Sequence, residues 1–169
     1  MFYINDIVNT SDLFNFTLYA DDSIIYVSGN SINEIIRATN HELNKVMNWI
    51  ACNKLTINVD KTHYVIFNRN KTFPLYTHPV LINNQPVRRE QITKFLGVLM
   101  DEQLNWKKHI LNIQTKINKQ SGIMYHTKSS LTPNAMKHIY YSLIYPHLNY
   151  CQIIWGAANK TSLQPLVTT

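Results

Sequence analysis

The stretch that decides the fold is Leu13–Val27, which reads Leu-Phe-Asn-Phe-Thr-Leu-Tyr-Ala-Asp-Asp-Ser-Ile-Ile-Tyr-Val. Its second half is rich in β-branched and aromatic residues, as strands are, and Asp21-Asp22 before it suits a turn. Its first half alternates between apolar and polar residues, as a half-buried strand does. One face of that strand carries Phe14, Phe16, Leu18 and Ala20. The stretch therefore predicts two short strands joined at a pair of adjacent carboxylates.

A long amphipathic helix is predicted downstream of this hairpin. Ser31 is a suitable N-cap, and Glu34, three residues on, completes a capping box. Apolar residues then recur with a period of 3.6 as far as about Cys52. These apolar residues are Ile32, Ile35, Ile36, Leu43, Val46, Met47 and Ile50.

Further strands are predicted in the middle of the chain. Thr62–Phe67 reads as a single strand. Val80–Val87, with Asn83-Asn84 at its turn, and Ile92–Met100 are candidates for further hairpin structure.

The chain becomes helical in character from Asn105 onward. Thr132-Pro133 predicts the start of one helix, with an N-cap followed by proline at the first helical position, and Pro146 predicts its end. An earlier helix has lysines around an apolar stripe that consists of Trp106, Ile110, Ile113 and Ile117. We place a boundary near residue 103, so the sequence predicts an α+β chain with domains at 1–102 and 103–169.

Composition excludes several classes of protein. The chain has 169 residues, 45% of them hydrophobic, which is enough for a core, and its 4 glycines and 6 prolines exclude collagen and low-complexity linkers. No apolar run approaches the roughly 18 residues that cross a bilayer, and the N-terminus does not read as a signal peptide. Cys52 and Cys151 are too few for a disulfide scaffold. We therefore expect an intracellular protein, nuclear or cytoplasmic, that is not secreted and has no membrane partner.

Charge is distributed unevenly along the chain. The formal net charge is +6, but residues 1–52 carry a net −4 and residues 53–169 a net +10. An acidic first part and a basic second part suit a cation site beside a phosphate-binding surface. Basic surfaces are also common in proteins of other function, so the charge alone leaves this open.

The adjacent carboxylates Asp21 and Asp22 carry the most specific chemistry. Two neighbouring negative charges repel each other, and a bound divalent cation removes the repulsion. Mg²⁺ takes hard oxygen ligands, often one or two carboxylates plus substrate phosphates, and a pair of such ions promotes phosphoryl transfer. The plainer interpretation is a solvated Asp-Asp turn.

The residues from Phe16 to Asp22 resemble the Tyr-x-Asp-Asp hairpin of reverse transcriptases, in the Tyr-Ala-Asp-Asp form of non-LTR retrotransposons and group II introns. Other segments resemble further motifs of that family and follow in its order, as in jockey-like elements. They are Phe2–Ile7; Trp49 with Asn53–Thr62; Thr93–Val98, continued by Asp101–Leu104, Trp106 and His109-Ile110; and Ile139–Pro146 with Tyr150 and Trp155-Gly156. The resemblance implies a partial polymerase palm, built of antiparallel hairpins and a helix, followed by a helical thumb-like region.

The resemblance also implies roles for residues near the carboxylates. Asp21 and Asp22 would be two of three carboxylates that hold Mg²⁺ or Mn²⁺, with Asp21 the more direct ligand. Tyr19 would lie against the primer end or the sugar of the incoming nucleotide, and Lys61 would protonate the leaving pyrophosphate. An ordinary strand tyrosine and a surface lysine are the plainer alternatives for the last two residues.

Binding of nucleic acid is implied for the second part of the chain. Phe95, Leu96 and Gly97 would form the tight turn that holds the primer backbone, although Leu96 also suits a core. The partners would be an RNA template, a DNA primer and deoxynucleotide triphosphates. The thumb would follow the duplex through phosphate contacts, unless its lysines are only a solvated helix face. The candidate lysines are Lys107, Lys108, Lys116 and Lys119.

The chain departs from the family pattern in one respect. The family's first catalytic aspartate and its finger motifs have no match among these residues, so the missing N-terminal part of the same polyprotein would have to supply them. We expect a fragment of an RNA-directed DNA polymerase that is inactive in isolation. The alternative is a non-catalytic retrotransposon remnant that only binds nucleic acid through its basic half, so enzyme activity stays open.

Overall fold

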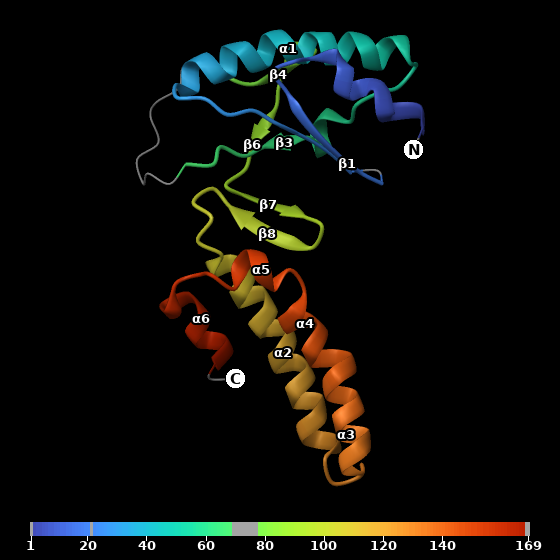
Figure 1. The fold of residues 1–169 in the computed structure, drawn as a ribbon, viewed down its shortest axis with the longest axis vertical. Helices are drawn as coiled ribbons and strands as arrows, with labels where there is room; N and C mark the ends of the chain where they lie inside the picture. The colour runs from blue at the N-terminus through green and yellow to red at the C-terminus, as the bar shows by residue number, and fades with distance from the viewer. Residues whose placement is uncertain (1, 21, 69–77, 168–169) are drawn as a thin grey trace. The chain divides into compact units, whose positions relative to one another are not determined.

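The computed structural model describes residues 2–20, 22–68 and 78–167, with backbone alone for residues 2 and 3. The chain forms two compact units, which are treated separately here: Met1–Tyr64 with Thr72–Glu90, and Val65–Lys71 with Gln91–Thr169. Helices and strands occur in both units (Figure 1), which confirms the α+β class in its coarse sense. In the described part of the chain, no helix has the length and apolar character that a membrane crossing needs.

The predicted hairpin is present in the first unit. Strands β1 (Asn15–Tyr19) and β2 (Asp22–Tyr26) pair antiparallel. Phe14 is buried, and Phe16 and Leu18 pack against the core as partly buried residues, which confirms the predicted apolar face at these three positions. Ala20, the fourth predicted position, is wrong, because it is exposed and lies beyond the end of β1. The 3₁₀ helix η1 (Phe2–Thr10) precedes this hairpin and packs on helix α1 (Ile32–Cys52).

Helix α1 confirms the predicted helix and its apolar period, since Ile36, Leu43, Val46, Met47 and Ile50 are all buried. The predicted capping box is wrong. Ser31 has the extended backbone of an N-cap, but its side chain makes no capping hydrogen bond. Its carbonyl accepts the first helical bond from Ile35 N–H, and Glu34 contributes only as a negative charge in the first turn.

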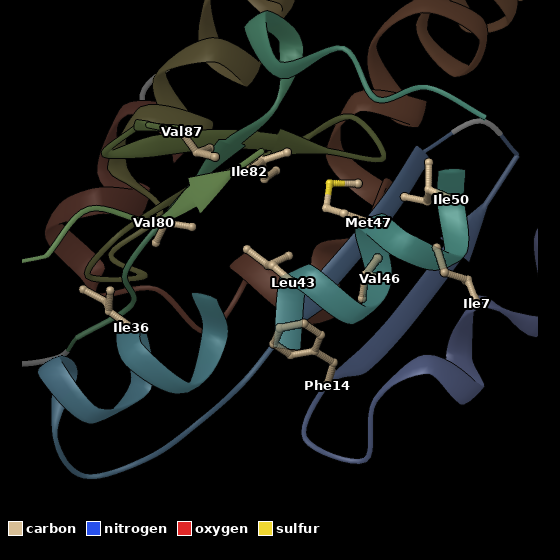
Figure 2. Packing of buried hydrophobic residues seen from close by; sticks show 10 residues of the cluster. All are labelled: Ile7, Phe14, Ile36, Leu43, Val46, Met47, Ile50, Val80, Ile82 and Val87. Carbon is tan, nitrogen blue, oxygen red and sulfur yellow. The ribbon is translucent and has the colours of Figure 1, made fainter. Parts of the chain in front are cut away.

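The core of the first unit lies along α1. Figure 2 shows Leu43 and Met47 on the helix side of this core and Val80, Ile82 and Val87 on the other side. Each such side chain contributes about 1.5–3 kcal/mol when buried, and most helical stability in proteins comes from such packing. The remaining cluster members are Ile7, Phe14, Ile36, Val46 and Ile50.

A second hairpin of the first unit confirms the predicted turn at Asn83-Asn84. These residues join β4 (Leu81–Ile82) to β5 (Gln85–Pro86). Their φ angles of +50° and +62° are those of a two-residue turn with left-handed residues, which asparagine tolerates well.

The strand predicted at Thr62–Phe67 is wrong in length. Only His63–Tyr64 (β3) is a strand, and it pairs in parallel with Arg88–Arg89 (β6). A helical turn, η2 (Val59–Lys61), ends just before β3. Val65 begins a segment of the second unit, in which Asn68 N–H donates to Glu102 O at 2.9 Å.

The second unit joins one hairpin to a set of helices (Figure 1). Strands β7 (Ile92–Phe95) and β8 (Val98–Asp101) pair antiparallel. Helix α2 (Lys107–Thr127) packs against β8, and its stripe of Ile110, Ile113 and Ile117 forms a core with Ile144 and Trp155. The other helices are α3 (Pro133–Ile139), the π-helix η3 (Tyr140–Ile144), α4 (Tyr145–Asn149), α5 (Gln152–Trp155) and α6 (Lys160–Val167).

The start of α3 is confirmed and its predicted stop is corrected. Thr132 Oγ1 accepts a hydrogen bond from Ala135 N–H at 3.3 Å, as an N-cap does. Pro146 does not stop the helical path, which continues through α4. Tyr145 N–H bonds to Tyr140 O, five residues back. This wider turn accommodates the proline, which has no N–H and would crowd the carbonyl four residues before it.

Candidate functional site

The carboxylate hairpin has its tip one residue earlier than predicted. Tyr19 pairs with Asp22, so Ala20 and Asp21 connect the two strands. Asp22 is therefore the first residue of the β2 ladder and not a turn residue. Ala20 has a φ of +53°, a left-handed conformation that is unfavourable for alanine. Asp21, the first of the two predicted metal ligands, lies outside the described residues.

The side chains of Tyr19 and Asp22 are exposed to solvent at this end of the hairpin. Directly opposed residues of a ladder have side chains on the same face, so Tyr19 and Asp22 lie beside each other. Tyr19 is 58% exposed, and the Asp22 carboxylate is exposed and unbonded within the described part of the chain. Asp22 thus offers the hard oxygen ligands that Mg²⁺ prefers. No group of three or more histidine, cysteine or acidic residues gathers in the described ranges.

A hydrogen bond from Ser11 to Glu42 fastens the segment just before this hairpin to α1, and Lys45 of the same helix pairs with that carboxylate. Ser11 Oγ donates to Glu42 Oε2 at 2.6 Å, and Lys45 Nζ lies 2.7 Å from Glu42 Oε1. The Lys45 ammonium and then the Ser11 hydroxyl hold the pKa of Glu42 below its usual value. Ser11 Oγ also accepts from Leu13 N–H. The chain entering β1 is thereby held against the helix, an attachment that the apolar period of α1 did not indicate.

Lys61 lies at the end of η2, on a backbone fixed by Asn58. The Asn58 side chain accepts from Lys61 N–H at 3.2 Å, and Thr62 Oγ1 donates to Asn58 O at 2.9 Å. The Lys61 side chain is exposed. The structure therefore fixes the backbone of the Lys-Thr pair and leaves the ammonium group in solvent.

Phe95, Leu96 and Gly97 lie at the tip of the hairpin β7–β8. Phe95 pairs with Val98, so Leu96 and Gly97 are the two turn residues. Their φ angles are +44° and +84°, as a type I′ turn requires. Leu96 is half-buried and Gly97 exposed. The tight turn is thus present, and its role with a primer stays a prediction.

The four predicted lysines are all exposed on α2. At about 100° per residue, Lys108 and Lys119 lie within about 20° of each other and opposite the isoleucine stripe. Lys107 and Lys116 flank that line on its two sides. The set Lys107, Lys108, Lys116 and Lys119, here called the lysine face, occupies the half of α2 that points away from the core. An amphipathic helix has this arrangement whether or not it binds phosphate.

Asp101 has a structural role that sequence reasoning missed. Asp101 is 7% exposed, and its carboxylate accepts hydrogen bonds from the backbone N–H groups of Gln103, Asn105 and Trp106. These bonds shape the loop between β8 and α2, where Leu104 and Trp106 have positive φ angles. An aspartate at the end of a strand is an available signal for such a bend, because its side chain accepts from backbone N–H groups of the residues that follow.

His109 is a second residue whose role was missed. It is 3% exposed, and its Nδ1 accepts from Leu99 N–H at 3.3 Å. Its ring contacts the ring of Trp155, with centroids 5.9 Å apart. Burial lowers the pKa of His109, and the positive charge of Lys116 lowers it further. His109 is therefore a neutral link between the hairpin β7–β8 and the helices.

The chain is similar in sequence to curated RNA-directed DNA polymerases of mobile elements, which confirms the resemblance carried by its motifs. No protein-family model matches the chain. No solved structure matches it either.

Among these relatives is the RNA-directed DNA polymerase from mobile element jockey of Drosophila melanogaster, 29% identical over 88% of this chain and 16% of the polymerase. The probable RNA-directed DNA polymerase from transposon X-element of the same fly is 30% identical over 65% of this chain and 12% of its own length. The corresponding protein from transposon BS is 26% identical over 85% of this chain. The chain thus spans 16% or less of these relatives' lengths.

Proposed function

We propose that this chain is the end of the palm, residues 1–102, and the start of the thumb, residues 103–169, of a reverse transcriptase from a non-LTR retrotransposon. The complete enzyme would extend a primer 3′-hydroxyl with deoxynucleotides along an RNA template inside the cell. The observation that carries the proposal is the family order of the motifs, together with similarity to RNA-directed DNA polymerases over 88% of the chain.

Asp21 and Asp22 are the residues proposed to hold Mg²⁺ or Mn²⁺. Divalent ions at such a site activate the attacking hydroxyl and stabilise the leaving oxygen in phosphoryl transfer. The exposed carboxylate of Asp22 supports the proposal, because its oxygens are not engaged by other described side chains. Tyr19, on the same face of the ladder, would contact the primer end or the sugar of the incoming nucleotide.

Lys61 is proposed to donate a proton to the leaving pyrophosphate or to stabilise its charge. Its exposed ammonium group and its fixed backbone are compatible with this role. The turn at Phe95–Gly97 would hold the primer backbone, and the lysine face would contact duplex phosphates. The third carboxylate and the fingers would come from outside this chain, so we expect the isolated chain to extend no primer.

Binding of a divalent cation tests the carboxylate site without an activity assay. Mn²⁺ titrated into ¹⁵N-labelled chain broadens amide signals near the ion. We expect the strongest broadening at Tyr19, which pairs with Asp22, and at Ser23, which follows Asp22 in the chain. The double variant Asp21→Asn with Asp22→Asn removes the anionic ligands and is expected to abolish that broadening.

The matched control for this titration is Asp12→Asn. Asp12 is an exposed acid just before β1, so its loss changes the charge but not the proposed ligands. The control is expected to broaden like the unaltered chain. Broadening at the hairpin that survives in the double variant would contradict the metal site.

A further inference from the structure

The turn at the tip of β7–β8 has an unfavourable sequence for its shape. Both central residues of a type I′ turn need a positive φ, and Asn-Gly is the usual pair there. Leu96 takes the first position with a φ of +44°. Leucine has no side-chain oxygen that would favour a left-handed backbone. Such a conformation persists only when surrounding groups hold it.

Tyr150 is the group that holds this turn. Its Oη donates a hydrogen bond of 2.5 Å to the carbonyl oxygen of Leu96, 54 residues earlier in the chain. Its ring also covers Gly97, since a methyl group added at Gly97 would lie 3.4 Å from Cε1 of Tyr150. The segment between α4 and α5 therefore adjoins the hairpin tip within the second unit (Figure 1).

The backbone of Tyr150 is anchored to the core of the same unit. Trp155 is 3% exposed, and its Nε1–H donates to Tyr150 O at 2.9 Å. Tyr150 N–H donates to Pro146 O at 3.0 Å, where α4 ends. Trp155 also contacts His109, which accepts the Leu99 N–H of β8. The hairpin β7–β8 is thus bonded to Tyr150 at its tip and to His109 along its second strand, and both of these residues contact Trp155.

The bond to Leu96 sets the direction of the next backbone donor. A trans peptide is planar, so the N–H of Gly97 points opposite to the Leu96 carbonyl. With that carbonyl bonded to Tyr150, the Gly97 N–H points away from the tyrosine. Gly97 is exposed, and its N–H has no acceptor among the described residues. A backbone N–H in this state is a good donor to a phosphate oxygen.

We propose that Tyr150 is a positioning residue for the primer: its hydroxyl fixes the Leu96–Gly97 peptide so that the Gly97 N–H meets a phosphate near the primer 3′ end. This role rests on the proposed function of the chain. Tyr150 itself touches no reacting atom and acts through the turn. The lysine face supplies the bulk of the affinity, while the turn determines where the 3′ end lies.

The test compares the 169-residue chain with its Tyr150→Phe variant, which loses only the hydroxyl. The matched control is Tyr141→Phe. Tyr141 lies on η3 in the same unit and, like Tyr150, is 51% exposed. Melting curves of both variants are measured first, and neither is expected to change the melting temperature much, because both rings remain in place.

The first readout is the backbone order of Gly97 from ¹⁵N relaxation. We expect an order parameter of about 0.85 in the unaltered chain and in Tyr141→Phe, and below about 0.6 in Tyr150→Phe. Unchanged order in Tyr150→Phe would overturn the proposal, because the hydroxyl would then not hold the turn.

The second readout is the position of a primer on the chain. A DNA primer on an RNA template carries 2-aminopurine either at its 3′ end or well inside the duplex. We expect Tyr150→Phe to bind within about twofold of the unaltered chain, because phosphate contacts elsewhere dominate affinity. The response of the 3′-terminal probe is expected to fall by about half or more, while the internal probe is unchanged.

Each outcome decides the role of Tyr150. A loss confined to the 3′-terminal probe supports it, and an equal loss at both probes overturns it, because general destabilisation affects both. If the turn loosens but neither probe changes, the primer role is overturned. If the unaltered chain binds no primer–template at all, the proposed function fails, and the relaxation data then show separately whether the hydroxyl holds the turn.

Discussion

Single residues at bends carry much of the specific structure of this chain. Asp101 organises the loop before α2, His109 accepts a backbone bond inside the second unit, and Tyr150 holds a turn. The bonds of His109 and Tyr150 could not be predicted from the sequence. Tyr150 and Leu96 lie 54 residues apart, and no local pattern marks a bond over such a separation. What the sequence does reveal at this scale is the local chemistry of Asn83-Asn84 and Thr132-Pro133.

The neutral state of His109 predicts a dependence of stability on pH. Burial lowers its pKa in the folded chain, so between that value and the usual value of about 6.5 the unfolded chain binds the extra proton. The free energy of unfolding therefore has its full value above about pH 6.5. It falls as the pH drops below that value, by up to about 1.4 kcal/mol per pH unit. Lys116 acts in the same direction, because its positive charge disfavours protonated His109.

Urea unfolding at pH 7.5 and 5.5, followed by tryptophan fluorescence, measures this effect. The His109→Asn variant keeps an acceptor near the Leu99 N–H but does not titrate, so it is expected to lose less stability on acidification. His138→Asn, at an exposed position of α3, is the control and is expected to behave like the unaltered chain. An equal pH dependence in His109→Asn and the unaltered chain would refute the assignment.

Secondary-structure elements were predictable where their buried apolar residues recur at a regular spacing along the sequence. Helices α1 and α2 and the hairpin β1–β2 show it, because their apolar residues recur at spacings of helix or strand. The strands β3 and β6 do not, since two residues are too short for a period and the parallel partner is far along the chain. The continuation of the helices through Pro146 was not predicted either, because the apolar period does not reveal the wide turn at Tyr140–Ile144.

The loop between β8 and α2 is expected to depend on the Asp101 carboxylate. Asp101→Ala leaves the N–H groups of Gln103, Asn105 and Trp106 without their buried acceptor, so we expect a loss of about 2–3 kcal/mol in the free energy of unfolding. Asp101→Asn keeps one acceptor oxygen and is expected to lose less. Urea denaturation measures both, with the exposed Asp12→Ala as the matched control. A loss below about 0.5 kcal/mol for Asp101→Ala would show that the loop does not need it.

At the scale of the whole molecule, the sequence predicted the positions of the candidate site residues but not how they work together. The motifs placed Tyr19, Asp22 and the Phe95–Gly97 turn on hairpin ends, and the structure has them there. The roles of these residues depend on groups that come together in a complete polymerase, which the spacing of residues along one chain does not reveal. The comparisons support the family, and the roles remain proposals.

The lysine face predicts how the chain binds nucleic acid. We expect weak binding to a hybrid duplex without sequence preference, and with a log–log salt slope of about −0.9 for each phosphate contacted. The triple change of Lys108, Lys116 and Lys119 to Gln is expected to reduce the magnitude of that slope by up to about 2.7. Fluorescence anisotropy from low to moderate salt measures it.

The matched control changes Lys128, Lys137 and Lys160 to Gln. These lysines are also exposed in the second unit, so the loss of net charge is equal, but they lie off the lysine face. The control is expected to keep most of the slope. Equal effects of the two triple variants would show that only net charge matters.

Primer extension tests the central claim most directly. The assay uses a complete polymerase into which this chain is placed as the proposed palm–thumb segment, with an RNA template, a DNA primer, deoxynucleotides and Mg²⁺. We expect Asp21→Asn to abolish synthesis while the melting temperature and duplex binding stay unchanged, and Asp12→Asn to keep its rate. An Asp21→Asn variant with more than about a tenth of the unaltered rate, a loss below about 1.4 kcal/mol in transition-state stabilisation, would contradict the assignment.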